Sequence, residues 1–152
     1  MVSITKARAG DAGKLLPLVA AYWDCESITG FDRSRVGSQL ERLLSTPGLG
    51  AGWIAHQDDV AVGYLVAVYV FSLEHLGLTA EIDEFFVVPS RRSSGIGAEL
   101  LRVAESEFVR NGCTNVSLQL SRSNDAARRF YRRFGFTDRA GYELLDKLLL
   151  AG

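Results

Sequence analysis

Residues 85–98 combine an apolar segment, two arginines, two serines and two glycines in a pattern suited to binding an anion. The apolar residues 85–88 predict the end of a strand, and Pro89 stops that strand. Helical spacing begins near Glu99, so the intervening loop leads into a helix whose first amides have no partner within the helix. Glycine lets a ligand approach the backbone closely, and unpaired amides at a helix start favour negative charge. This chemistry suits a phosphate group.

A Gly-x-Gly after a strand is also consistent with a tight turn that only feeds a surface helix. Two well-known phosphate loops are excluded, because no Gly-Lys-Ser/Thr follows the glycines and Leu100 stands where Gly-x-Gly-x-x-Gly would end. The pattern that remains is Arg-x-x-Gly-x-Gly-Ala at residues 92–98.

This loop resembles the pyrophosphate-binding motif of the GNAT superfamily of N-acetyltransferases. Residues 124–136 also resemble that family's Asn-x-x-Ala-x-x-Phe-Tyr-x-x-x-Gly-Phe segment, in the same order along the chain. A weaker similarity extends from residues 4–9 to residues 142–146. Residues 82–87, in which an acidic pair precedes an aromatic pair, look most similar to the diamine (spermidine/spermine-type) acetyltransferases.

The resemblance implies that acetyl-CoA is the cosubstrate and predicts which residues bind it. In similar enzymes the pantetheine arm pairs with backbone groups of the fourth strand, which implies Phe86, Val87 and Val88 here. The pyrophosphate would bind the loop amides of Arg92, Ser93, Ser94, Gly95, Ile96, Gly97 and Ala98. Many members have glycine after the loop arginine, so any positive φ at Ser93 or Ser94 would cost about 1 kcal/mol.

Acetyl transfer to an amine needs a base, because alkyl amines have a pKa of about 10 and arrive protonated. Glu81, Asp83 and Glu84 are the acidic candidates, and strand alternation predicts Glu81 and Asp83 on one face and Glu84 on the other. The resemblance favours Asp83 and Glu84 jointly and leaves open which is the base. Pairing with arginines at the rim of the sheet is the alternative.

Tyr131 and Asn124 belong to the second motif. The resemblance implies that Tyr131 is the general acid for the departing thiolate, whereas the residues alone predict a core aromatic pair with Phe130. Asn124 is predicted to cap a helix by accepting from the amide of Ala126 or Ala127, and the resemblance also implies contact with pantetheine.

Three residues near the end of the first predicted helix are candidates for binding a cationic amine. Tyr22 and Trp23 could supply cation–π contacts and Glu26 an ion pair, although packing and a solvated charge explain them equally well. The predicted function is direct transfer of the acetyl group from acetyl-CoA to a primary amine of a small molecule, polyamine or amino-acid-like. The alternatives are a non-catalytic acyl-CoA-binding or sensor domain and an acetyltransferase for a protein amine.

The elements predicted around these residues form one mixed α/β domain over residues 1–152. The resemblance implies a central sheet of about seven strands, splayed between the fourth and fifth, with about four helices. Strands are expected at 2–8, 51–57, 60–72, 80–88 and 116–120 and in a final pair from Phe136 to 146, and helices at 11–23, 34–44, 95–110 and 124–134. The unbroken apolar run at 60–71 predicts a strand covered on both faces.

Composition limits the partners. With 17 Lys and Arg against 18 Asp and Glu, the chain has no overall field that would recruit nucleic acid or an anionic membrane. Residues 1–7 lack a secretory signal and residues 60–71 are too few to cross a bilayer, so a cytoplasmic protein is expected. The isolated cysteines and histidines argue against a metal site. The apolar residues 148–150 and terminal edge strands favour a homodimer.

Overall fold

The computed structural model describes residues 1–149, which fall into two compact units. The first unit spans Met1–Gln119 and the second begins at Leu120.

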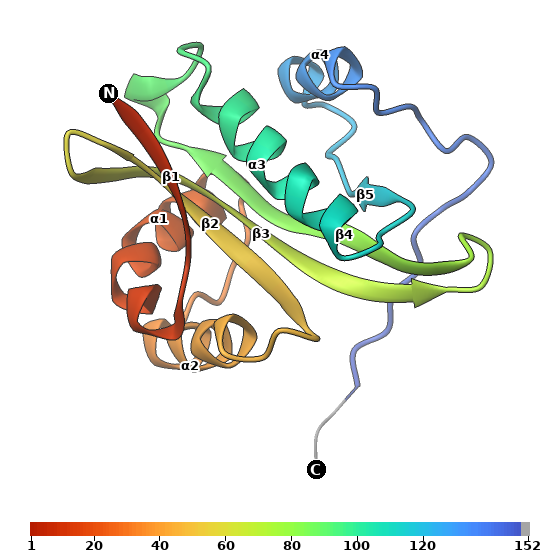
Figure 1. Cartoon of the computed structure of the whole chain (residues 1–152), viewed down its shortest axis with the longest axis horizontal. Helices are drawn as coiled ribbons and strands as arrows, with labels where there is room; N and C mark the ends of the chain where they lie inside the picture. The colour runs from red at the N-terminus through yellow and green to blue at the C-terminus, as the bar shows by residue number, and fades with distance from the viewer. Residues whose placement is uncertain (150–152) are drawn as a thin grey trace. The chain divides into compact units, whose positions relative to one another are not determined.

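The first unit is built on one five-stranded sheet with the strands in sequence order (Figure 1). Its elements are β1 (Val2–Lys6), η1 (Ala9–Asp11), α1 (Ala12–Cys25), α2 (Arg33–Leu44), β2 (Gly50–Gln57), β3 (Val60–Ser72), β4 (Gly77–Val87), η2 (Pro89–Arg91), α3 (Ile96–Arg110) and β5 (Val116–Leu118). Strands β1 to β4 pair antiparallel, and β5 pairs parallel to β4. The mixed α/β fold and the order of these elements confirm the sequence-based expectation.

Helices cover both faces of this sheet. Figure 1 shows α1 and α2 on one face and α3 on the other. Successive residues of β2 reach the two sides: Ile54 joins the core formed with α1 and α2, while the Trp53 ring lies 5.7 Å from the Phe108 ring of α3. The middle of β3 is likewise buried throughout, which confirms that the long apolar run is a covered central strand.

A β-bulge interrupts the pairing of β4 with β3. Glu84 lies opposite Val66 and Ile82 lies opposite Ala67, so the intervening Asp83 has no residue opposite it. An extra residue in one strand bends that strand and changes the face to which the following side chains point. Simple strand alternation therefore fails at this position.

Strand β4 is also unpaired along much of its other edge. Strand β5 pairs with β4 only from Ala80 to Ile82, so the β4 backbone from Asp83 to Val87 has no strand beside it on that side within the first unit. The predicted separation of the fourth and fifth strands is present as this open edge.

The second unit is organised by α4 (Asp125–Arg133). Asn124 caps the helix start by accepting from the Ala127 amide at 3.1 Å, as predicted. At the other end Gly135 has φ +89°, its amide donates to Arg132 O, and the Phe136 amide donates to Tyr131 O. These two bonds form a Schellman motif, so the glycine ends the helix as expected.

The predicted count of seven strands is wrong. The described residues hold five strands, and the expected final pair from Phe136 to residue 146 has no ladder. A short isolated strand pair is marginal in water without further strands or a helix to cover its apolar face, and the side chains of Leu144, Leu145 and Leu148 are indeed exposed. Leu150, part of the expected dimer contact, lies outside the described residues.

Candidate active site

The loop between β4 and α3 presents a row of unpaired backbone amides. Arg92 N–H donates to Pro89 O, and Glu99 N–H donates to Gly95 O. Within the first unit, no protein acceptor faces the six amides between them, which belong to Ser93, Ser94, Gly95, Ile96, Gly97 and Ala98. Three of these amides lie in the loop and three in the first turn of the 15-residue helix α3, an arrangement suited to an anion such as a phosphate.

Two residues in this loop adopt left-handed backbone conformations. Gly95 has φ +87° and stands at the N-cap of α3, where glycine meets no steric cost. Ser93 has φ +63°, although it carries a side chain. The conformational strain expected for a serine with positive φ in this loop is therefore present at Ser93 and costs about 1–2 kcal/mol of stability.

Arg92 holds the loop against the end of β4. Its Nε donates to Val87 O at 2.8 Å, and its guanidinium lies 5.4 Å from the centre of the Phe86 ring. The side chain thus has a structural role beside its predicted part in binding the pyrophosphate.

The register of β4 decides which backbone groups face the open edge. Val88 N–H donates to Val62 O and Val88 O accepts from Arg91 N–H, so both groups are already used. Because hydrogen-bonded and non-bonded pairs alternate in an antiparallel ladder, Phe86 faces Tyr64 while Val87 faces away from β3. Of the three residues predicted to pair with pantetheine, only Val87 directs its N–H to the open edge. The backbone groups of Phe86 and Val88 are already used within the first unit, so Val87 is the member of the three left to pair with pantetheine.

A cavity of about 410 Å³ brings the predicted carboxylates together in the first unit. Asp83 and Glu84 both line it, contrary to the expectation that they face opposite sides of the sheet, because the bulge at Asp83 breaks the alternation. The other lining residues come from α1, α2, the loop between them and β3: Val19, Trp23, Gly30, Asp32, Arg35, Val36, Gln39, Leu40, Leu43 and Val66.

Glu84 is fixed by two neutral donors. Trp23 Nε1 donates to one carboxylate oxygen at 2.8 Å, and Tyr64 Oη donates to the other at 2.9 Å. Burial raises the pKa of Glu84, the two hydrogen bonds partly oppose that rise, and the charge of Asp83 adds to it. A carboxylate with a raised pKa is better matched to accepting a proton near neutral pH.

Asp83 stands beside Glu84 with a different environment. No hydrogen bond or ion pair holds its carboxylate within the described residues, and its side chain reaches solvent at the cavity. Loss of surrounding water, followed by repulsion from Glu81, raises the pKa of Asp83. Glu81 itself accepts from Gln119 Nε2 at 3.3 Å and does not line the cavity.

The three residues predicted to bind the amine have different positions. Trp23 lines the cavity and orients Glu84. Tyr22 packs edge-on against Tyr64 and Phe86, and burial, with a contribution from Glu26, raises its pKa to about 12. Neither Tyr22 nor Glu26 lines the cavity, so only Trp23 stands where the prediction requires.

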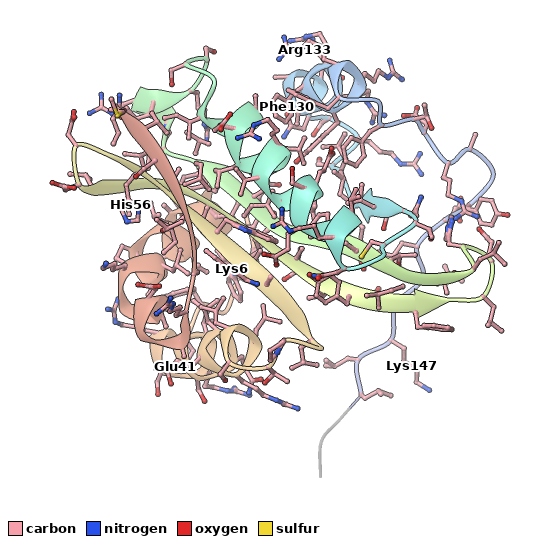
Figure 2. The ribbon with its side chains drawn as sticks, in the orientation of Figure 1. Lys6, Glu41, His56, Phe130, Arg133 and Lys147 are labelled. Atoms are coloured by element: carbon pink, nitrogen blue, oxygen red, sulfur yellow. The ribbon has the colours of Figure 1, made fainter. Side chains whose placement is uncertain are left out.

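In the second unit, Tyr131 is part of an aromatic cluster. Its ring lies 5.3 Å from Phe130 and 5.4 Å from Phe136. Arginines of the same helix are largely engaged locally: Arg128 and Arg132 each contact Asp138 at 3.3 Å, and Arg133 lies over Phe130 at 5.9 Å (Figure 2).

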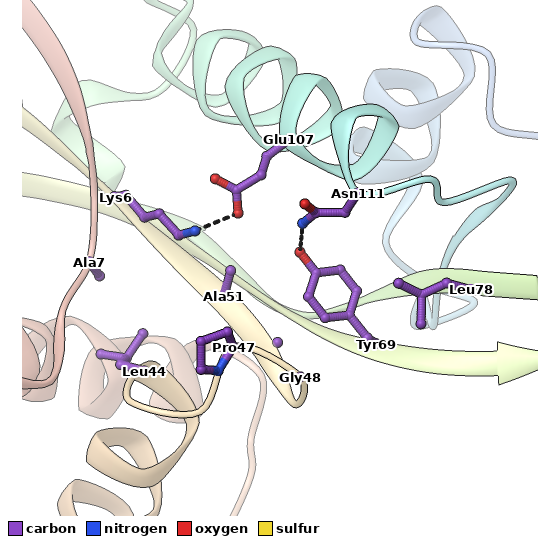
Figure 3. A pocket seen from close by; sticks show the side chains of 11 residues that line it. Lys6, Ala7, Leu44, Pro47, Gly48, Ala51, Tyr69, Leu78, Glu107 and Asn111 are labelled. Carbon is purple, nitrogen blue, oxygen red and sulfur yellow. Dashed lines mark hydrogen bonds and ion pairs between the residues drawn. The ribbon is translucent and has the colours of Figure 1, made fainter.

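A second cavity, of about 440 Å³, contains none of the predicted site residues (Figure 3). Its polar side chains are paired with one another: Lys6 contacts Glu107 at 2.8 Å, and Asn111 donates to the Tyr69 hydroxyl at 2.8 Å. The cavity with Asp83 and Glu84 is therefore the better candidate for acid–base chemistry.

Sequence reasoning missed Tyr64 and Arg35. Tyr64 lies inside an apolar strand, where its ring predicts only packing, and its bond to Glu84 depends on the bulge. Arg35 lies at the start of α2, and no motif marks it.

Comparisons with known proteins agree on one family. The model of the acetyltransferase (GNAT) family matches residues 16–136. An uncharacterised N-acetyltransferase of Archaeoglobus fulgidus is 35% identical over 114 residues, covering 74% of this chain and 77% of that protein. A thialysine N-epsilon-acetyltransferase of Bos taurus is 24% identical over 154 residues, covering 90% of this chain and 85% of that protein.

A solved structure shows the same fold. An aminoglycoside N-acetyltransferase in complex with CoA superimposes with a TM-score of 0.84 at 19% identity, covering 97% of this chain and 95% of that one. Over residues 1–149, no helix combines the length and apolar character needed to cross a membrane.

We predict that Ser93→Gly stabilises the protein by up to about 1 kcal/mol, because relief of the left-handed strain exceeds the added chain entropy. Ser94→Gly is the matched control. Ser94 has no positive φ and its hydroxyl donates to Arg91 O at 2.6 Å, so this change should destabilise by about 1 kcal/mol. Urea unfolding measures both, and equal destabilisation by the two variants would contradict the strain at Ser93.

We also predict a pH-dependent gain of stability for Glu84→Gln. The raised pKa means that the native state keeps the Glu84 proton after the unfolded chain has lost it. Unfolding free energy of the parent therefore falls, relative to Glu84→Gln, as pH rises from the ordinary pKa of 4.5 to the raised one, and the deficit persists above it. Urea unfolding between pH 4 and pH 7 measures the difference, with Glu41→Gln on the exposed side of α2 (Figure 2) as control. A difference that stays constant over this range would refute the assignment.

Proposed function

The chain belongs to the GNAT acetyltransferase family and is an acetyl-CoA-dependent N-acetyltransferase, and we propose that it acetylates a primary amine of a small molecule by direct transfer. The observation that carries this proposal is the cavity into which the β4 bulge directs both Asp83 and Glu84. A site for a protonated amine requires negative charge and an acceptor for the proton, and this pair supplies both.

We assign the base function to the Asp83–Glu84 pair. Glu84, held by Trp23 and Tyr64, is the fixed member, and each of its oxygens retains a lone pair for the ammonium group. Asp83 is the less constrained member and is one methylene shorter than the glutamate of resembling enzymes. Transfer of the amine proton to Asp83 therefore proceeds through a water molecule, whereas Glu84 accepts directly.

The cosubstrate is held by the β4 edge and the loop that follows it. In this proposal the pyrophosphate accepts hydrogen bonds from the amides of residues 93–98, and Val87 N–H pairs with the pantetheine arm. Arg92 keeps the end of β4 and the loop in register through its bond to Val87 O.

We propose chemical roles for Tyr131 and Asn124, which belong to the second unit. The amine nitrogen attacks the thioester carbonyl, the new C–N bond forms as the C–S bond breaks, and the phenol of Tyr131 gives its proton to the departing sulfur. Asn124 has a backbone role as the cap of α4, and we propose that its amide also contacts pantetheine. The family match over residues 16–136 includes parts of both units, which supports a single acetyltransferase domain over residues 1–152.

Two observations support a small acceptor. The cavity volume of about 410 Å³ suits a small molecule. Similarity to a thialysine N-epsilon-acetyltransferase also favours an amine of amino-acid size over a protein side chain.

We further propose a cytoplasmic homodimer. The exposed apolar side chains of Tyr142, Leu144, Leu145, Leu148 and Leu149 support self-association, because apolar surface of this extent is normally covered. A sedimentation mass equal to the single-chain 16.6 kDa would exclude the dimer.

We predict that Tyr131→Phe lowers kcat by about 10²–10⁴-fold while acetyl-CoA affinity stays unchanged, because only the transferable proton is removed. Thiol release with a panel of small amines measures turnover, and calorimetry with acetyl-CoA measures affinity. Tyr142→Phe, at an exposed tyrosine of the same unit, is the matched control and should retain full activity.

The outcomes separate the alternatives. Full activity in Tyr131→Phe would reject this residue as the acid. Cofactor binding by the parent protein without thiol release for any small amine would reject the proposed function. In that event, release with peptide amines would identify a protein acceptor, and no release at all would identify a sensor domain.

A further inference from the structure

The cavity beside Asp83 and Glu84 contains a positive side chain as well as negative ones. Two of its carboxylates, Asp83 and Glu84, lie on β4, Asp32 stands at the N-cap of α2, and α2 contributes the guanidinium of Arg35. We propose that the acceptor is a zwitterion, with an amine that binds Asp83 and Glu84 and an anionic group that binds Arg35. This inference rests on the proposed function and names the substrate class of the same site.

Local structure does not account for Arg35. Its guanidinium has no ion pair or side-chain hydrogen bond within the described residues. The residue stands in the first turn of α2, which contains no acidic side chain, and a cation there opposes the helix dipole. Arginine at this position thus costs helix stability, and binding an anion in the cavity would offset that cost.

A third carboxylate, that of Asp32, lines the cavity near Arg35 and uses one oxygen to cap α2. Asp32 caps α2, and its side chain accepts from the Arg35 backbone N–H at 3.0 Å. Gln39 follows Arg35 by four residues, which places both on one side of the helix, and both line the cavity. The two side chains together offer N–H donors along the α2 wall.

This arrangement discriminates against a diamine. A second ammonium group that reached the Arg35 guanidinium would be repelled, whereas a carboxylate, phosphonate or phosphate would pair with it. Among the described residues, Asp32 is the one carboxylate on this wall, and its Oδ1 is engaged by the cap of α2. The guanidinium fork can donate two parallel hydrogen bonds to any of these anions. The cavity therefore favours an amino-acid-like acceptor over the polyamine suggested by residues 82–87.

Two matched pairs of compounds test the proposal. Lysine and cadaverine differ by one carboxylate, and 3-aminopropylphosphonate and propylamine differ by one phosphonate. For the parent protein we expect kcat/KM to be at least about 10-fold higher for the anionic member of at least one pair. The pair with the larger ratio distinguishes a carboxylate from a phosphonate acceptor.

Arg35→Ala should reduce kcat/KM for the preferred zwitterion by about 10–100-fold and leave its partner amine within about twofold, since only a charge-assisted contact is lost. Arg35→Lys keeps the positive charge but lacks the guanidinium fork, so its kcat/KM for the zwitterion should lie between those of the parent and Arg35→Ala. Arg33→Ala is the matched control, because Arg33 lies in the same turn and does not line the cavity.

Measuring the affinity for each compound, independently of turnover, tests the zwitterion proposal separately from the proposed reaction. Calorimetric titration of the four compounds should show that the parent protein binds the zwitterion more tightly than its matched amine. In Arg35→Ala this difference in affinity should disappear. Equal affinity for both members of each pair, tighter binding of cadaverine, or equal losses for both members in Arg35→Ala would overturn the proposal even if amines are acetylated. Selective zwitterion binding without thiol release would support the substrate class and reject the proposed reaction.

Discussion

The β-bulge at Asp83 is the constraint on which the candidate site depends. Without the extra residue, alternation along β4 would direct Asp83 and Glu84 to opposite faces of a sheet that is covered by helices on both sides. The bulge brings the two carboxylates to one cavity under α1 and α2. Burial and repulsion from neighbouring carboxylates then raise their pKa values, and two donors from α1 and β3 fix one of them. A local irregularity of one strand thus creates a pair of carboxylates suited to accepting a proton.

The same strand also organises the cosubstrate side. Because β5 leaves β4 after three residue pairs, the later β4 backbone has an open edge. The chain then turns at η2 into a loop that, with the first turn of α3, holds six free amides. Arg92 ties that loop back to Val87. Two departures from regular pairing have these consequences. The bulge at Asp83 places carboxylates on one side of β4, and the short pairing with β5 leaves backbone groups unpaired along its edge. In the proposed mechanism, one strand thereby serves both reactants.

Much of this organisation is predictable from the sequence. Periodicity and turn residues locate each helix and the first five strands to within a few residues, and the loop motif together with the second motif at residues 124–136 points to an anion-binding loop. The bulge is not predictable in this way, because no glycine or other residue at Asp83 marks it, and the contacts of Tyr64 and Trp23 with Glu84 depend on it. The prediction of the final two strands is wrong for a different reason. Their residue pattern is strand-like, but a strand needs a partner, and none pairs with these segments among the described residues.

The most direct test of the account is the pH dependence of kcat/KM for Asp83→Asn/Glu84→Gln with any amine the parent protein acetylates. If the two carboxylates remove the proton, the double variant should lose about 10²–10⁴-fold at pH 7, and the loss should shrink toward pH 10, where alkyl amines deprotonate unaided. Glu41→Gln, on the exposed side of α2, is the control and should match the parent at pH 7 and at pH 10. An equal loss for the double variant at pH 7 and pH 10 would contradict a role as base and leave the cavity as a binding site only.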